Sequence, residues 1–210
     1  MISKFLVQGA YMADPTSGTA SSHVEEMAQT CVKYVQEALG LKLDFTPETL
    51  PILDHYVRTK VGNTNEELAQ LLISTLGTYF GEVIRQTLGA HWYAPGEEYT
   101  EYRLEFAPFF LHFNPLGVAA EVIQGEDVDG YGTHFQILDE ARDVVEDALA
   151  KNETVSVDEY YSFTIRYETL ELVTSVLMGL ESLNQKLPRT FGPEVYRAAR
   201  GTPKSQGEPS

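Results

Sequence analysis

The sequence predicts a mainly helical α+β fold, and three observations support that prediction. Several long segments repeat apolar residues at spacings of three and four, the period of an amphipathic helix. Most of these segments follow a Ser, Thr or Asn in the position of a helix cap. Residues 91–113 instead contain short apolar and alternating stretches, which are typical of strands. The 210 residues are enough for one domain with a substantial core.

Residues 1–20 are rich in small polar residues, Gly and Pro, and we expect them to form an irregular N-terminal arm. Ser22 and Glu25 then have the spacing of a capping box, in which the two side chains satisfy backbone amides of the first turn. An apolar stripe follows and ends at Gly40, a residue typical of helix C-termini. The first helix is therefore predicted to start at Ser22.

Two more helices are predicted before the strands. Thr46 and Pro47 mark an N-cap and a first helical position. The next helix, about residues 64–88, has a Leu-rich face and a second face of small residues that includes Gly77 and Gly81. Glycine inside a helix costs about 1 kcal/mol relative to alanine, so a close neighbour is expected to offset that cost. We predict that this helix is central and packed on both sides.

A small antiparallel sheet is predicted from residues 91–113, packed against the central helix. His91 begins the first stretch, residues 101–106 alternate apolar and charged side chains, and residues 109–113 are apolar except for His112. Pro108 separates the last two stretches and fits a bend or an edge, because proline donates no hydrogen bond to a ladder.

Three helices are predicted after the sheet. Asn114 caps a short one that ends near Gln124. A capping box at Thr133 and Gln136 predicts the start of the next. The segment 157–185 first alternates like a strand, but its spacing of three and four lasts longer and follows a capping box at Ser156 and Glu159, so we predict one helix.

The composition changes to Gly, Pro, Ser and basic residues near the C-terminus. We expect residues 188–210 to form a flexible basic tail. No internal repeat and no clear linker interrupts residues 1–187, which are therefore predicted to be a single α+β domain.

Negative charge is concentrated in the middle of the chain. The formal net charge is −16, and residues 97–159 hold 16 acidic and 3 basic side chains. This charge repels a phosphate backbone and favours a cationic protein partner, although acidic surfaces also serve solubility alone. No apolar run approaches the roughly 20 residues of a membrane helix. We therefore expect no nucleic acid and no membrane among the partners.

The acidic candidates for partner binding lie in one predicted helix and in the loop before it. They are Asp139, Glu140, Asp143, Glu146 and Asp147 in the helix, and Glu126, Asp127 and Asp129 in the loop. The loop resembles the opening of a calcium-binding loop, but Tyr131 and Leu138 occupy the fifth and twelfth positions, where an EF-hand needs oxygen ligands. We predict no metal site.

A second candidate site contains Glu82 and Arg85, one turn apart on the central helix, with Trp92 nearby in sequence. Buried charges need partners, so the two residues form either an internal ion pair or a ligand site beside aromatic residues. The histidines lack zinc-binding spacing, Cys31 lies on an apolar stripe, and the nucleophile, phosphate and dinucleotide motifs are absent. We predict no cofactor and lean towards a protein without enzymatic activity.

One part of the chain resembles a known group of proteins. In LGTYFGEVIRQTLGAHW, residues 76–92, the residues Gly77, Gly81, Glu82, Gly89 and Trp92 match a GxxxGExxxxxxGxxW pattern. The pattern is similar to that of small bacterial proteins classed as domains of unknown function. Residues 113–125, FNPLGVAAEVIQG, resemble the segment that follows in such proteins. The resemblance implies a bacterial α+β domain and implies no activity.

We predict a non-enzymatic interaction protein whose acidic surface, residues 97–159, binds a cationic protein, either as a toxin-neutralising or as an assembly or regulatory protein. We expect it in the cytoplasm, since one cysteine gives no sign of disulfides and the first residues lack a signal-peptide pattern. Two alternatives remain open: a ligand-binding protein or enzyme with its site around Glu82, and a scaffold component that docks through its C-terminal tail. The oligomeric state is left open.

Overall fold

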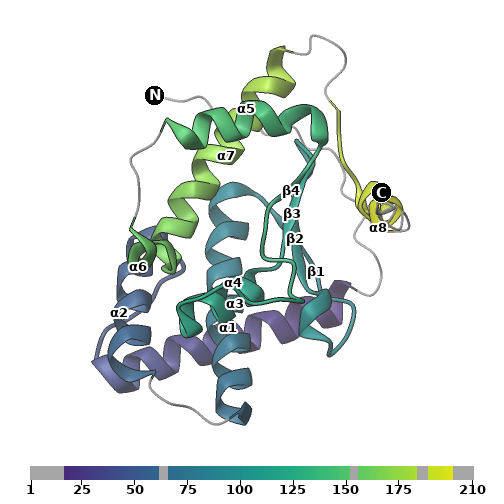
Figure 1. The fold of residues 1–210 in the computed structure, drawn as a ribbon. Helices are drawn as coiled ribbons and strands as arrows, with labels where there is room; N and C mark the ends of the chain where they lie inside the picture. Colours follow the sequence, from purple (N-terminus) through teal and green to yellow (C-terminus); the bar gives the residue numbers. More distant parts are fainter. Residues whose placement is uncertain (1–16, 62–65, 152–155, 184–188, 201–210) are drawn as a thin grey trace, which may run out of the picture.

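The computed structural model describes residues 17–61, 66–151, 156–183 and 189–200 and confirms a mainly helical α+β fold (Figure 1). The helices are α1 (Ser17–Leu39), α2 (Leu50–Lys60), α3 (Glu66–Leu88), α4 (Pro115–Gln124), α5 (Asp139–Ala150), α6 (Val157–Tyr160), α7 (Phe163–Leu183) and α8 (Pro193–Arg200). Short 3-10 turns are η1 (Pro47–Thr49) and η2 (Tyr99–Glu101). The strands β1 (His91–Tyr93), β2 (Arg103–Glu105), β3 (Leu111–Phe113) and β4 (Gln136–Ile137) form one antiparallel sheet in that order.

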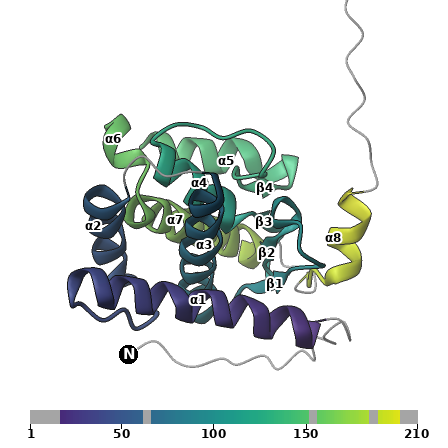
Figure 2. The same cartoon turned by 90° about the horizontal axis from the view of Figure 1, so that it is seen from below.

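Helix α3 is the centre of the fold, as predicted. Every residue from Leu72 to Ile84 is buried, and α1, α4 and α7 pack against the helix. Figure 2 shows α1 crossing beneath α3 and the sheet. A Cβ atom on Gly77 would lie 2.5 Å from the Leu116 backbone of α4, so the glycine allows the two helices to approach closely. The predicted small-residue face therefore has the close neighbour that it requires.

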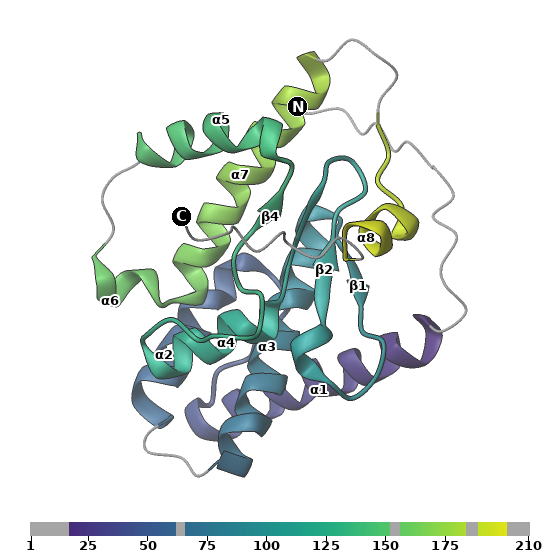
Figure 3. The same ribbon diagram turned by 45° about the vertical axis from the view of Figure 1, so that its right-hand side comes forward.

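The sheet has an apolar and a polar face. Trp92, Leu104 and Phe113 are neighbours across β1, β2 and β3 and belong to the core that includes α3. His91, Glu105, His112 and Gln136 form a row on the opposite face. Helix α8 lies over this polar face (Figure 3). The sheet therefore separates the main core from the C-terminal helix.

The prediction for the N-terminal region is wrong in part. Helix α1 begins at Ser17, so residues 17–20 are helical and Ser22 lies within the helix rather than at its cap. Val24 and Met27 belong to a buried cluster with apolar residues after β1. Such tertiary packing stabilises a helix start that local propensity does not specify. The remainder of the predicted arm, residues 1–16, lies outside the described residues.

Two further helix starts need correction. Gln136 and Ile137 pair with β3 as the strand β4, so α5 starts at Asp139 and not at the predicted box. The predicted helix over residues 157–185 is divided, because α6 ends at Tyr160 and α7 begins at Phe163. Asp54 of α2 accepts hydrogen bonds from the amides of Phe163 and Thr164 and so caps α7 separately. The capping box at Ser156 and Glu159 is confirmed at the start of α6.

The C-terminal segment differs from the predicted free tail over residues 189–200. Its helix α8 carries Tyr196, which is buried with Phe110 and Phe191 in a small apolar cluster. The Tyr196 hydroxyl accepts hydrogen bonds from the backbone amides of Phe106 and Leu111, both at 3.2 Å, where β2 and β3 separate. These contacts hold the helix on the sheet. The rest of the predicted tail, residues 201–210, lies outside the described part of the chain.

Candidate functional site

The predicted pair on α3 forms a closed network with the indole of β1. Arg85 donates to both carboxylate oxygens of Glu82, at 2.8 Å from Nε and 2.9 Å from Nη2. Trp92 Nε1 donates to Glu82 Oε1 at 2.9 Å, and Gln86 makes a longer bond to Oε2 at 3.4 Å. Each carboxylate oxygen thus has a donor within the protein. The Glu82 side chain is 9% exposed, so the geometry favours the ion-pair reading over a ligand site.

The electrostatics of Glu82 agree with a structural role. Burial raises the pKa of this carboxyl, but the hydrogen bonds and charge of Arg85, with the bonds from Trp92 and Gln86, outweigh it and hold the pKa below its usual value. A small cavity of about 180 Å³ lies beside the pair, between α1 and α3. Glu82 stays ionised there and is fully engaged.

The residues that carry the resemblance come together in space. A Cβ atom on Gly81 would lie 2.1 Å from the Trp92 ring, which the carboxylate of Glu82 holds in place. Gly89 has a φ of 73°, the left-handed conformation that ends α3 before β1. The pattern is therefore explained as a packing unit of α3 with β1 and α4. Membership of the protein group stays a prediction.

The structure contains two buried ion pairs that the sequence did not reveal. Glu121 of α4 and Arg166 of α7 are 1% and 8% exposed and are joined through Oε2 and Nη2. Tyr160 lies over the Arg166 guanidinium, 3.9 Å from ring centroid to Cζ. Within the part of the chain that the structure describes, Glu121 Oε1 and Arg166 Nε have no hydrogen-bond partner. Since 45 positions separate the two residues, no local spacing indicates the pair.

The second pair lies on the polar face of the sheet, where the sequence pattern predicted strand residues without a special role. Arg103 Nε donates to Glu105 Oε1 at 2.7 Å, and the guanidinium lies 4.0 Å from the Tyr93 ring centroid. An open cavity of about 550 Å³ adjoins this face. Its rim includes His112, Gln136 and Ala199. Helix α8 therefore covers the polar face only in part.

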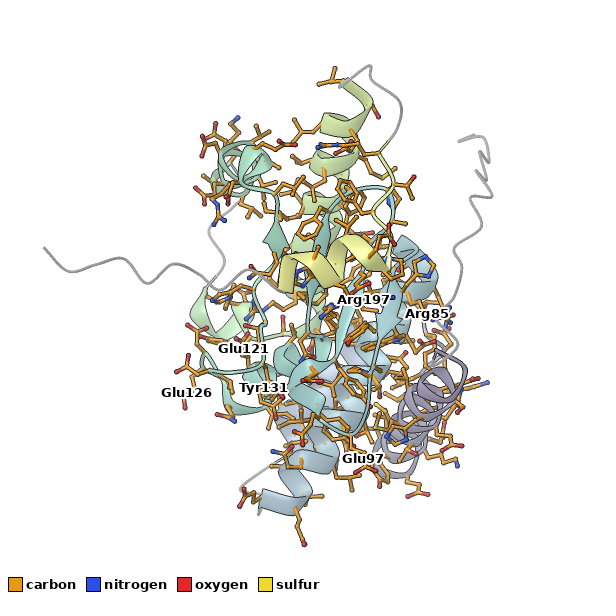
Figure 4. The ribbon with its side chains drawn as sticks, turned by 90° about the vertical axis from the view of Figure 1, so that its right-hand side faces the viewer. Arg85, Glu97, Glu121, Glu126, Tyr131 and Arg197 are labelled. Carbon is orange, nitrogen blue, oxygen red and sulfur yellow. The ribbon has the colours of Figure 1, made fainter. Side chains whose placement is uncertain are left out.

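The acidic candidates separate into two surfaces. Asp139, Glu140, Asp143, Glu146 and Asp147 are all exposed on α5, whose buried residues Ala141 and Val145 face α7. The loop candidates Glu126, Asp127 and Asp129 are also exposed, and Figure 4 shows Glu126 at the edge of the molecule.

The two surfaces lie near opposite ends of α7. Tyr161, which follows α6, donates to Asp127 Oδ1 at 3.1 Å and so links the loop to the start of α7. Helix α5 instead packs near Leu177 and Leu180, in the second half of α7. The eight candidates are thus not brought into one cluster.

The pairing of the α5 carboxylates is uneven. Asp139 pairs with Arg142 at 2.9 Å, and Glu140 pairs with Arg189 at 2.8 Å. Asp143, Glu146 and Asp147 have no ion pair among the described residues. These three carboxylates remain available for a partner.

Arg189 also bounds a cavity that no sequence pattern indicated. It spans from Glu140 on α5 to Glu181 on α7, across a cavity of about 320 Å³ whose lining combines apolar and charged side chains. The predicted flexible tail thus contributes a charged side chain to this part of the surface.

The described part of the chain shows no group of three or more His, Cys, Asp or Glu side chains arranged to hold a metal ion. Within the same residues, no helix has both the length and the apolar character needed to cross a lipid bilayer.

Comparisons with models of protein families, with curated proteins and with solved structures find no match for this chain. Function is therefore inferred from the molecule's own geometry and charge.

Proposed function

We propose that the protein is a non-enzymatic interaction protein that binds a basic protein partner through the exposed side of α5. The observation that carries the proposal is the pairing of the α5 carboxylates: Asp143, Glu146 and Asp147 are exposed and have no ion pair within the described residues. Charged groups in this state keep most of their attraction for an incoming cation, because no internal partner neutralises them.

The basic side chains of the same region do little to reduce this charge. Residues 97–159 contain Arg103, Arg142 and Lys151 as their basic residues. Arg103 is buried against Glu105, and Arg142 pairs with Asp139. The negative potential along α5 therefore favours fast, salt-sensitive association with a basic surface. A toxin that the protein neutralises and a basic component of an assembly both fit this description.

The two alternatives receive less support. A ligand site at Glu82 requires a carboxylate oxygen that a ligand can reach, whereas Arg85, Trp92 and Gln86 engage both oxygens. A docking tail requires a segment that is free to leave the domain, whereas Tyr196 is buried against the sheet. We also propose a cytoplasmic location, since Cys31 is buried and has no disulfide partner, which fits a reducing compartment.

The test is capture of partners from a lysate of the source cells at about 0.05 M and 0.5 M salt, read by mass spectrometry. We expect a basic protein that is retained at low salt and released at high salt. The variant Asp143→Lys, Glu146→Lys, Asp147→Lys is expected to lose that protein.

A matched control makes the same change of net charge elsewhere. Glu26→Lys, Glu37→Lys and Glu66→Lys alter exposed carboxylates of α1 and α3. This control is expected to retain the partner. Equal loss with both triple variants, or retention by the α5 variant, would show that α5 is not the binding surface.

A further inference from the structure

A cavity of about 320 Å³ lies between α5, α7 and the segment before α8. We call it the α5–α7 pocket. Its apolar lining consists of Phe109, Phe110, Leu138, Ala141, Leu177 and Leu180. The volume is close to the lower end of the range of ligand pockets, and the lining suits a large apolar group.

The mouth of this pocket is charged. Arg189 Nη1 donates to Glu140 Oε1 at 2.8 Å, and Arg189 Nε donates to Glu181 Oε2 at 3.1 Å. These hydrogen bonds raise the pKa of Arg189 above its usual range, so the guanidinium stays charged. Two carboxylates against one guanidinium leave the rim with a negative charge. An apolar anion is therefore a poor fit.

The rim continues into the acidic surface of α5. Glu140, Val144 and Asp147 follow one another at intervals of four and three residues, so they lie on one side of the helix, with Asp143 beside them. At 1.5 Å per residue, Asp147 is about 10 Å along the axis from the rim. Val144 is 43% exposed among these carboxylates. The pocket and the acidic stripe thus form one surface with an apolar and a negative part.

We propose that the α5–α7 pocket receives an aromatic or large aliphatic anchor side chain of the basic partner, and that flanking Lys or Arg residues pair with Asp143 and Asp147. This inference rests on the proposed function and specifies the partner as a basic segment with an apolar anchor. Charge complementarity favours this occupant, because a neutral apolar ligand would bring no positive charge to the carboxylates of the rim and of α5. Interfaces typically depend on such a buried anchor with a polar rim around it.

The test uses two dye-labelled helical peptides of about 18 residues, or five turns, rich in Lys and Ala. One carries a single central Trp, and the other carries Ser at that position. Binding to the full chain is measured by fluorescence anisotropy at low and high salt. We expect the Trp peptide to bind about tenfold tighter, while both peptides lose affinity in high salt.

Variants of the pocket separate the anchor from the charge. Ala141→Phe fills the cavity from α5, and Leu180→Trp fills it from α7; circular dichroism and thermal melting identify which variants keep the fold. Either folded variant is expected to bind the two peptides within about twofold of each other, with the Ser peptide unaffected. Arg189→Gln frees Glu140 and Glu181 and is expected to tighten both peptides about two- to threefold.

The outcomes separate the two proposals. Equal binding of both peptides to the unmodified protein, or an unchanged Trp preference in the filled variants, would overturn the anchor pocket. Salt-sensitive binding of both peptides that requires Asp143, Glu146 and Asp147 would still support the α5 surface. Binding that does not depend on these three residues would contradict the proposed function itself.

Discussion

Three buried carboxylates of this protein are paired with arginines, whereas most of the exposed carboxylates of α5 have no ion pair among the described residues. Glu82, Glu105 and Glu121 are buried, and each pairs with an arginine. Aromatic rings lie over two of these arginines, Arg103 and Arg166. The carboxylates of α5 are exposed, and among the described residues ion pairs form with two of them, at the start of the helix. The same residue types thus have different environments in the two regions.

The contrast between buried and exposed carboxylates distinguishes charges that stabilise the fold from charges that can bind a partner. A buried carboxylate without its arginine destabilises the fold, because desolvation is then uncompensated. An exposed carboxylate adds little to stability and is free to act on a partner. Interior substitutions are therefore expected to change the free energy of unfolding, and α5 substitutions to change binding.

The largest effect is expected at the pair that joins α4 to α7. Glu121→Ala leaves Arg166 buried without its counter-charge and is expected to lower the free energy of unfolding by about 3–5 kcal/mol. The double variant Glu121→Leu, Arg166→Met removes both charges and is expected to recover most of this loss. Urea denaturation measures both. A single variant as stable as the unmodified protein would mean that the pair is not truly buried.

The next effect concerns the space that holds Trp92 near Glu82. Gly81→Ala places a Cβ atom 2.1 Å from the indole ring, and we expect a loss of up to about 3 kcal/mol. Gly179→Ala in α7 is the matched control, because no atom of the described residues lies within 4 Å of its Cβ position. The control is expected to gain about 0.5–1 kcal/mol from helix propensity. Thermal melting of the two variants should shift in opposite directions.

A smaller effect is expected at the contact that holds α8. Tyr196→Phe removes the hydroxyl that accepts from the Leu111 amide and is expected to cost about 1–2 kcal/mol. Tyr131→Phe is the control, since it also removes one tyrosine hydroxyl, and it is expected to change the free energy of unfolding by less than about 0.5 kcal/mol. Proteolysis in native buffer should also become faster near residues 189–200 in the Tyr196 variant. Identical stability of the two variants would favour the free tail that the sequence predicts.

Local signals in the sequence predicted several elements correctly. The Asn114 cap fixes the start of α4, where its side chain accepts from the Leu116 amide, and the capping box at Ser156 fixes the start of α6. The glycines of α3 correctly indicated a close neighbour, because glycine inside a helix costs about 1 kcal/mol relative to alanine and close packing offsets that cost. The two caps depend on contacts within a few residues, whereas the neighbours of the glycines come from other elements, Leu116 of α4 and Trp92 of β1.

The failures share a different cause. The break between α6 and α7 depends on Asp54, which caps α7 from a position 109 residues earlier. Strand β4 exists because β3 offers it a hydrogen-bonding edge, and its two residues carry no strand pattern of their own. The Glu121–Arg166 pair and the α5–α7 pocket likewise need segments far apart in sequence. Composition alone identified the acidic region, but it did not show which carboxylates would remain unpaired.

The smallest expected effect is a difference between buried and exposed carboxylates in how the free energy of unfolding depends on pH. Burial opposes ionisation of Glu82, but Arg85 and the other donors hold its pKa below the ordinary value of 4.5. The unfolded chain therefore takes up a proton before the folded one, so the stabilisation by Glu82 is complete above about pH 4.5 and is lost as pH falls through the folded pKa. The stability difference between the unmodified protein and Glu82→Gln should shrink over that range.

The expected shrinkage is about 0.5–1 kcal/mol, because Arg85 is 44% exposed and solvent screens the pair. Burial raises the pKa of Asp54, so the stabilisation by Asp54 is lost as pH rises, opposite to that of Glu82. Both proteins contain Asp54, so its contribution cancels when the stability of Glu82→Gln is subtracted from that of the unmodified protein. Asp143→Asn is the exterior control, because the Asp143 side chain is exposed and has no ion pair among the described residues. The same pH dependence for both substitutions in urea denaturation would mean that Glu82 behaves as a surface charge. The distinction between buried and exposed carboxylates would then not hold for Glu82, the residue for which the sequence suggested an internal ion pair.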